Sequence, residues 1–407
     1  MSQINISEKY ENLFNPPVGV DTFVVTGGRF SQKSFAVALA SLVWAIRDNH
    51  RIMFSRFTNV SAADSIIPEI EEKISMMNYE KYFDVNKARI TSTINDSKIV
   101  FKGMKSGSGN QTANLKGLKD FSVWILDEAE ELTDFDVAEK TMLSVRGNSQ
   151  GSDHPNMKVL IMNPTTKTHW VYEKYFTEKG VSAGYNGVKG NICYIHTSYL
   201  DCLEFVPDDF LSYFNDMKEN NPSRYNHIIL GGWLDKAEGV IFERWKYGDF
   251  QECGINGYGL DFGFSIDPTA LVQMSIDTKR KKCYWKLHTY KTGLSTDQIF
   301  NECSICGDSL IIADSAEPRL ISELKSKGLN IKACVKGAGS VTQGITSMQD
   351  YEHIIDPSSA KLGTEFNNYV WNDKKSKTPI DLYNHGIDAG RYIFTRLIKK
   401  QSKFFIV

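Results

Sequence analysis

The sequence has no apolar run long enough to cross a membrane. Its longest one, residues 35–46, is interrupted by Ser41 and followed by Arg47 and Asp48, whereas a spanning helix needs roughly 20 apolar residues. Residues 1–12 alternate polar and charged side chains and lack the apolar stretch of a secretory signal. We therefore expect no membrane segment and a protein that stays in the cytoplasm where it is made.

Cysteine is also scarce, with 7 residues in a chain of 407, and these thiols form no regular framework. Their odd number fits a reducing compartment better than a disulfide-linked secreted scaffold. Cys303 and Cys306 form one CxxC pair, but a zinc site needs a second pair or nearby histidines. We therefore expect the cysteines to have a structural role as free thiols packed in the fold.

An excess of either charge is missing as well, since 47 basic and 49 acidic side chains give a net charge of −2. A protein that bound nucleic acid over its whole surface would be clearly basic. Any contact with DNA must therefore be local.

The length and the order of elements predict two α/β domains. A chain of 407 residues exceeds what one hydrophobic core usually supports. The first half alternates short apolar stretches with helical ones, which is typical of a doubly wound, mostly parallel sheet. We expect strands at 21–26, 51–57, 98–102, 121–126 and 158–162 and a helix at 34–47, then strands at 259–262, 270–276, 283–290 and 309–313 and a closing helix at 384–399. The predicted organisation is a first domain at 1–230, a linker at 231–254 and a second domain at 255–407.

A phosphate-binding loop is predicted between the first strand and the first helix. Backbone N–H groups of such a loop wrap phosphates, while a lysine reaches the outer phosphates and a hydroxyl ligates Mg²⁺. Gln32 takes the place of the second glycine of the GxxxxGK[ST] pattern, and the alternative is a polar turn before a buried helix. The candidate ATP-binding residues are Gly27, Gly28, Arg29, Ser31, Gln32, Lys33 and Ser34.

Two further strand ends support this interpretation. An apolar strand ends in Asp127 and Glu128, where the first carboxylate would orient Mg²⁺ and the second would polarise the attacking water. Asn163 follows another strand and would lie beside the outermost phosphate. The alternatives are a helix cap for the acids, an Asn-Pro turn for Asn163 and a solvated loop position for Arg29.

A second site is predicted from acids in the latter half. Asp261 and Asp314 each end an apolar strand, and Asp388 lies on the closing helix. Carboxylates that converge repel one another unless divalent cations neutralise them, and hard oxygen ligands favour Mg²⁺ or Mn²⁺. Each acid has the alternative of a turn or cap role. Asp267 and His385 are less specific neighbours whose roles the sequence leaves open.

Lysines precede a loop of small residues at 332–340. Lysine binds phosphate without reading sequence, so this loop suits contact with a DNA backbone, and a solvated hairpin is the alternative.

These motifs together resemble the large terminase subunit of tailed bacteriophages over nearly the whole chain. The resemblance rests on a P-loop with Arg29 and without its second glycine, and on the blocks at 124–128, 163–164, 231–233, 238–242, 261, 313–318 and 388–392. It implies a P-loop ATPase domain followed by a ribonuclease-H-like nuclease domain. Glu128 would be the catalytic carboxylate of the first and Asn163 its coupling residue, and Asp261, Asp314 and Asp388 would be the catalytic metal ligands of the second.

The resemblance also implies a biological setting. Such enzymes use ATP and Mg²⁺, with Mg²⁺ or Mn²⁺ at the nuclease site, to pump double-stranded DNA into a procapsid and to cut concatemers. The implied partners are the portal protein and the small terminase subunit, with a monomer in solution and a ring on the procapsid. The implied location is the cytoplasm of an infected bacterial host, not the mature virion. The rival interpretations are a helicase-like ATPase with a non-cleaving DNA-binding domain, and a catalytically inactive portal adaptor.

Overall fold

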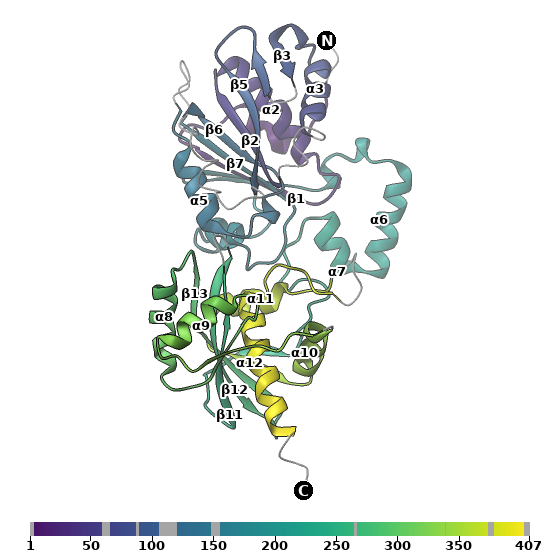
Figure 1. Cartoon of the computed structure of the whole chain (residues 1–407). Coiled ribbons are helices and arrows are strands. Elements are labelled where there is room, and N and C mark those ends of the chain that lie inside the picture. Colours follow the sequence, from purple (N-terminus) through teal and green to yellow (C-terminus); the bar gives the residue numbers. More distant parts are fainter. Residues whose placement is uncertain are drawn as a thin grey trace. The chain divides into compact units, whose positions relative to one another are not determined.

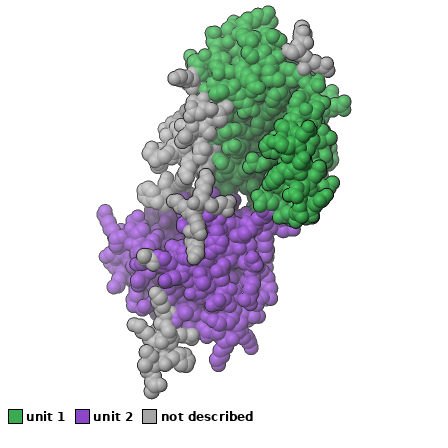
Figure 2. Space-filling model, turned by 90° about the vertical axis from the view of Figure 1, so that its right-hand side faces the viewer, with its two compact units in different colours: residues 1–234 green, residues 235–407 purple. Residues whose placement is uncertain are grey.

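The chain divides into two compact units, Met1–Leu234 and Asp235–Val407, which Figure 2 colours separately. The computed structural model describes residues 4–58, 66–86, 89–105, 120–147, 155–263, 267–337, 339–372 and 378–402. Both units are α/β, as the sequence predicts. Within the described residues, none of the helices combines the length and the apolar character that a membrane crossing requires.

Unit 1 is built on a nine-stranded sheet in the order β3-β4-β5-β2-β6-β7-β1-β9-β8. Six neighbouring strands of this sheet, β5-β2-β6-β7-β1-β9, run parallel to one another. The outer pairs β3/β4, β4/β5 and β8/β9 are antiparallel. The strands are β1 (Thr22–Gly27), β2 (Arg51–Thr58), β3 (Phe83–Asn86), β4 (Arg89–Ser92), β5 (Lys98–Lys105), β6 (Val123–Leu126), β7 (Met157–Met162), β8 (Gly187–Lys189) and β9 (Ile192–Thr197). The helices are α1 (Glu11–Phe14), α2 (Lys33–Arg47), α3 (Ile67–Met76), α5 (Phe135–Ser144), α6 (Asp208–Asn220) and α7 (Pro222–Arg224).

Apolar side chains cover both faces of this sheet. Phe23 and Val25 of β1 pack in one core with α2 and α3, whereas Val24 between them packs in a second core with Trp124 of β6. Alternate residues of a strand point to opposite faces, so a strand buried on both sides is apolar throughout. The five strands and the helix expected in this half are present, and β3, β4, β8 and β9 were not foreseen.

Unit 2 contains a seven-stranded mixed sheet in the order β10-β16-β13-β12-β11-β14-β15. Its middle strands β11, β12 and β13 are antiparallel, and β14 runs parallel to β11. The strands are β10 (Trp245–Tyr247), β11 (Ile255–Asp261), β12 (Pro268–Asp277), β13 (Lys282–Thr292), β14 (Ile311–Ala313), β15 (Ile331–Ala333) and β16 (Glu352–Ile355). The helices are α8 (Thr296–Cys303), α9 (Pro318–Ser326), α10 (Ser340–Gln349), α11 (Ala360–Asn368) and α12 (His385–Ser402).

Helix α12 packs closely on this sheet, and Figure 1 shows it crossing β11 and β12. A Cβ atom added at Gly259 of β11 would lie 1.8 Å from the Ala389 carbonyl oxygen, and one at Gly390 would lie 1.9 Å from the Trp285 ring. Glycine at these positions therefore lets the helix approach the sheet. This approach carries the first turn of α12 to the end of β11.

The stretch expected to be a linker, residues 231–254, is divided between the units. Gly231 to Leu234 belong to unit 1, where a Cβ atom on Gly231 would lie 2.5 Å from the Gly27 carbonyl carbon. From Asp235 onward the chain belongs to unit 2, and Ile241 and Phe242 are buried in its core. Apolar side chains at these positions give the segment core contacts that an independent linker would not have.

Candidate functional sites

The loop after β1 begins with two glycines that lie against the neighbouring backbone. Added Cβ atoms would lie 2.0 Å from the Thr197 carbonyl oxygen at Gly27 and 1.9 Å from the Ile229 carbonyl oxygen at Gly28, so both positions require glycine. Gln32, which replaces the expected second glycine, adopts the left-handed conformation with φ 60°. The chain therefore keeps the backbone that a glycine would supply, at the steric cost of a side chain.

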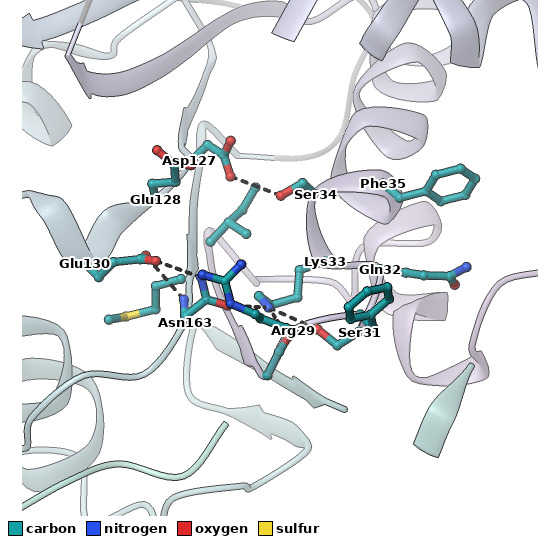
Figure 3. Close-up of a pocket in the computed structure, with 14 residues that line it drawn as sticks. Arg29, Ser31, Gln32, Lys33, Ser34, Phe35, Asp127, Glu128, Glu130 and Asn163 are labelled. Atoms are coloured by element: carbon teal, nitrogen blue, oxygen red, sulfur yellow. Dashed lines mark hydrogen bonds between the residues drawn. The ribbon is translucent and has the colours of Figure 1, made fainter. Parts of the chain in front are cut away.

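Lys33 is a buried cation whose hydrogen-bond partners, in the part of the chain that the structure describes, are all neutral oxygens. Its Nζ atom lies 2.9 Å from the Gly27 carbonyl and 2.8 Å from the Gly28 carbonyl. It also lies 3.0 Å from Ser31 Oγ and 3.1 Å from Asn163 Oδ1, both of which Figure 3 labels. Burial lowers the pKa of this lysine to about 8, and the charges of the nearby carboxylates oppose that effect. A buried positive charge without a direct carboxylate partner favours binding of an anion.

Asp127 and Glu128 follow β6 on the opposite side of the same cavity. Ser34 Oγ donates to Asp127 Oδ1 over 3.2 Å, so the hydroxyl and carboxylate expected around Mg²⁺ are adjacent. Arg56, at the end of the neighbouring strand β2, donates to Asp127 Oδ2 from Nε at 2.8 Å and from Nη2 at 2.6 Å. Burial raises the pKa of Glu128, although Arg56 Nη1 lies 3.8 Å from its Oε1 atom. A raised pKa makes a carboxylate a better general base.

Asn163 connects this lysine to a further acid. Its Nδ2 atom donates to Glu130 Oε1 over 2.8 Å, and its backbone N donates to Glu130 Oε2 over 3.2 Å. Because both donors are held, the Oδ1 atom of Asn163 faces Lys33, as Figure 3 shows.

Sequence reasoning missed both Arg56 and Glu130. Arg56 ends a strand parallel to β6, which was an available signal for a residue at this sheet edge. Glu130 lies two residues after Glu128, but nothing in the sequence pairs it with Asn163.

These groups surround a cavity of about 340 Å³ that is also lined by Gly28, Arg29 and Gln32. Arg29 is exposed there, and its backbone N donates to the Ile228 carbonyl over 3.0 Å. The cavity brings together a buried cation, a hydroxyl beside a carboxylate and a strand-end glutamate. Residues of this chemistry fit a nucleoside triphosphate with its Mg²⁺, which Ser34 and Asp127 would hold.

The three acids of unit 2 also approach one another. Asp261 ends β11, and the backbone N of Asp314 donates to the Leu260 carbonyl over 3.0 Å, because β14 pairs with β11 in parallel. Asp388 lies in the first turn of α12. Burial raises the pKa of Asp261, and the charge of Asp314 adds to it. Burial likewise raises the pKa of Asp388, with the charge of Asp261 adding to it. Asp261 is therefore close enough to Asp314, and Asp388 to Asp261, for their charges to interact.

A basic or polar partner holds each of these carboxylates. His385 Nδ1 lies 3.1 Å from Asp261 Oδ2, and the Tyr392 hydroxyl donates to Asp261 Oδ1 over 3.3 Å. Arg391 Nε donates to Asp388 Oδ1 over 3.0 Å. Lys336 forms an ion pair with Asp314.

Within the described ranges, no three histidine, cysteine or acidic side chains form a ready metal-ligand set. The ion pairs give the reason, since each carboxylate points toward its own partner. The chemistry of the donors still fits Mg²⁺ or Mn²⁺, because neighbouring carboxylates gain from a divalent cation, and burial raises the pKa of Asp261 and of Asp388.

Asp267 and His385, whose roles the sequence left open, lie near these acids. Asp267 is largely exposed and its Oδ1 atom lies 3.9 Å from His385 Nε2. Burial lowers the pKa of His385, but the hydrogen bond and charge of Asp261 outweigh it and raise that pKa overall. His385 thus acts in this structure as a partner of Asp261.

Glu365 is a buried acid that sequence reasoning missed. This residue of α11 is 1% exposed, and it accepts hydrogen bonds from Gly386 N at 3.0 Å, Ile387 N at 2.8 Å and the Tyr290 hydroxyl at 2.8 Å. It therefore caps the helix that carries Asp388, through free N–H groups that every helix start presents. A glutamate in the middle of another helix gives no local sign of this role.

Comparisons with known proteins identify related sequences and a related fold. The family model described as phage terminase large subunit matches residues 20–232, and the one described as terminase RNase H-like domain matches residues 261–396. The terminase large subunit of Bacillus phage SPP1 is 28% identical over 405 residues, with 93% of this chain and 92% of the relative covered. The PBSX phage terminase large subunit of Bacillus subtilis is 24% identical over 359 residues, covering 81% and 79% of the two chains. The crystal structure of the HK97 bacteriophage large terminase shares the fold with a TM-score of 0.54, at 11% identity, over 96% of this chain and 95% of that one.

Proposed function

This chain belongs to the phage terminase large subunit family, and on that premise we propose that it hydrolyses ATP to move double-stranded DNA into a procapsid and cuts that DNA at a separate nuclease site. The family gives it an ATPase domain and an RNase H-like domain. We assign the ATPase to the domain predicted at residues 1–230 and the nuclease to the domain predicted at residues 255–407.

The buried ammonium group of Lys33, whose hydrogen-bond partners among the described residues are all neutral oxygens, carries the ATPase half of the proposal. A phosphate entering the cavity would meet this ammonium group together with the backbone N–H groups of the loop. Glu128 would accept a proton from the attacking water, and Asp127 with Ser34 would hold Mg²⁺. Asn163 contacts Lys33 directly, which supports a role in sensing the outermost phosphate.

The convergence of Asp261, Asp314 and Asp388 supports the nuclease half. These acids would hold Mg²⁺ or Mn²⁺, and two such cations activate water and stabilise the leaving oxygen when bound. The chain itself supplies the carboxylates and orients that of Asp261 through His385 and Tyr392. This argues against the helicase-like and inactive alternatives, because a protein that only bound DNA would gain nothing from repelling buried acids.

Family membership also supports the proposed partners. We assign double-stranded DNA as substrate and the portal protein and the small terminase subunit as partners, with a monomer in solution and a ring on the procapsid. The place of action would be the cytoplasm of the infected bacterial host.

One experiment on the full chain tests both halves. ATP turnover and plasmid cleavage are measured with Mg²⁺, with Mn²⁺ and with a chelator. We expect ATP hydrolysis in Mg²⁺, cleavage in at least one of the two metals and neither activity in the chelator. ATP turnover without cleavage in either metal would favour the helicase-like alternative, and loss of both activities would favour the inactive adaptor.

A further inference from the structure

Unit 2 contains a second cavity that the proposed chemistry does not use. It has a volume of about 290 Å³ and lies among β15, the loop that follows it, α10 and α12. Its lining within the described residues includes no carboxylate. Four basic side chains line it, namely Lys332, Lys336, Arg391 and Arg396. A cavity of this composition favours an anionic ligand.

The rest of the lining combines neutral donors with apolar side chains such as Ile312, Val335 and Phe394. Ser340 begins α10 after Gly339, which adopts the left-handed conformation with φ 72°, and Gln343 and Ser347 follow on the same helix. A Cβ atom at Gly344 would lie 2.9 Å from the side chain of Arg391, so this glycine lets the arginine pass α10. Hydroxyl and amide groups beside cations are the usual donors to phosphate oxygens.

The cavity shares part of its wall with the acid site. Lys336 pairs with Asp314 and lies 5.9 Å from the centre of the Tyr392 ring. Arg391 pairs with Asp388 and lies 4.9 Å from the same ring, whose hydroxyl contacts Asp261. A ligand in the cavity would therefore sit next to the three carboxylates.

The remaining two cations are available to a ligand. Lys332 and Arg396 are exposed, and neither has an acidic partner among the described residues. By contrast, Lys336 and Arg391 already neutralise Asp314 and Asp388. The net surplus of positive charge therefore comes from Lys332 and Arg396.

We propose that this cavity is a subsite for a backbone phosphate of the DNA strand, adjacent to the bond cut at the acid site. The proposal rests on the proposed nuclease function. Lysine and arginine bind phosphate without selecting a base, as a packaging enzyme that cuts DNA requires. The volume is near the lower end for small-ligand pockets, so it suits one sugar-phosphate unit rather than a whole duplex.

Equilibrium DNA binding by the full chain tests the subsite. Fluorescence anisotropy of a labelled duplex is measured in Ca²⁺, which binds oxygen ligands without supporting efficient cutting. The test variant combines Lys332→Ala with Arg396→Ala. The control combines Lys279→Ala with Arg280→Ala, which removes the same charge from the exposed turn after β12, at the other end of the strands from Asp261.

We expect affinity to fall about 10-fold in the test variant, and the slope of log K against log salt to lose about 2 units, because two phosphate contacts disappear. The control should keep the wild-type slope. Equal slopes in the two variants, with wild-type melting temperatures, would overturn the subsite.

Two further readouts separate this proposal from its premise. In Mn²⁺ the test variant should raise KM for DNA while leaving kcat and ATP turnover near wild type. If the wild type cuts DNA and the test variant binds it normally, only the subsite fails, whereas a wild type that does not cut removes the nuclease premise. Thermal stabilisation by inorganic phosphate that the variant loses, with DNA binding intact, would assign the cavity to a free anion and overturn the proposal.

Discussion

The buried lysine of the first candidate site and the acids of the second are held in opposite ways. In unit 1, Lys33 is surrounded by neutral oxygens, and its nearest contacts include Gly27, Gly28 and Ser31 of its own loop. In unit 2, each acid is paired with a side chain from elsewhere in the chain or from its own helix, such as Lys336 for Asp314. A charge without an ionic partner is ready for a ligand, whereas a paired charge must exchange its partner. The comparison therefore predicts one site prepared for its anion and one that a cation must reorganise.

The strongest test of the separation between the sites is Lys33→Ala. Loss of the cation should reduce ATP turnover by about 10,000-fold, since a charge placed on a transferring phosphoryl group has an effect of that order. Metal-dependent DNA cleavage should stay near wild type, because the two sites lie in different cores. Steady-state ATPase and plasmid assays measure both. Normal ATP turnover would remove Lys33 from the site, and a parallel loss of cleavage would break the comparison.

The reciprocal test is Asp261→Asn. It removes a charge and a ligand from the acid site, so cleavage should fall about 1,000-fold while ATP turnover persists. Asp314→Asn and Asp388→Asn should behave alike, and double variants should lose little more, because residues that act as a unit are not additive. Near-normal cleavage by a folded Asp261→Asn protein in Mn²⁺ would contradict the role of all three acids.

Glu128→Gln sharpens the division of roles within the nucleotide site. The variant should bind ATP but hydrolyse it about 100-fold more slowly, the usual effect of losing a general base. Asp127→Asn should instead weaken binding of Mg²⁺ and ATP, because Asp127 contacts Ser34 and Arg56. Nucleotide affinity and single-turnover rates distinguish the two, and interchangeable kinetics would show the assignment to be wrong.

The smallest expected effect concerns Glu365, whose burial raises its pKa from 4.5 to about 7. An acid with a raised folded-state pKa stabilises the fold fully below its unfolded pKa, and this stability is lost as pH rises through the folded value. Wild-type unit 2 should therefore lose about 2 kcal/mol of stability between pH 5 and pH 8. Tyr290 and His385 face the same carboxylate and remain in every variant.

Glu365→Gln should make the stability of the protein less dependent on pH. At pH 5 the variant should be less stable by about 1 kcal/mol, because an amide cannot accept both backbone hydrogen bonds and the tyrosine bond equally well. By pH 8 the difference should shrink or reverse. Thermal unfolding across this range measures it, with exposed Glu323→Gln as the control. Identical slopes for wild type and Glu365→Gln would show that Glu365 does not titrate as described.

The sequence could predict which residues line the candidate site of unit 1, because they are local or lie at strand ends. The loop from Gly27 to Ser34 is continuous in sequence, and Asp127 and Asn163 each follow a parallel strand of the same sheet. Parallel strands bring their carboxyl ends to one edge, so the pattern alone predicts proximity. The same argument brought Asp261 and Asp314 together through β11 and β14.

The sequence by itself thus determined the α/β class, the loop around Lys33 and the acids at the strand ends, because periodicity and strand ends are local properties. Only the tertiary structure decided the partners of those groups. Arg56 reaches Asp127 across 71 positions, Lys336 reaches Asp314 from beyond helix α9 and strand β15, and Glu365 caps a helix that begins 20 residues later. Such contacts depend on how side chains pack between elements, and a partner of this kind leaves no period or spacing in the chain.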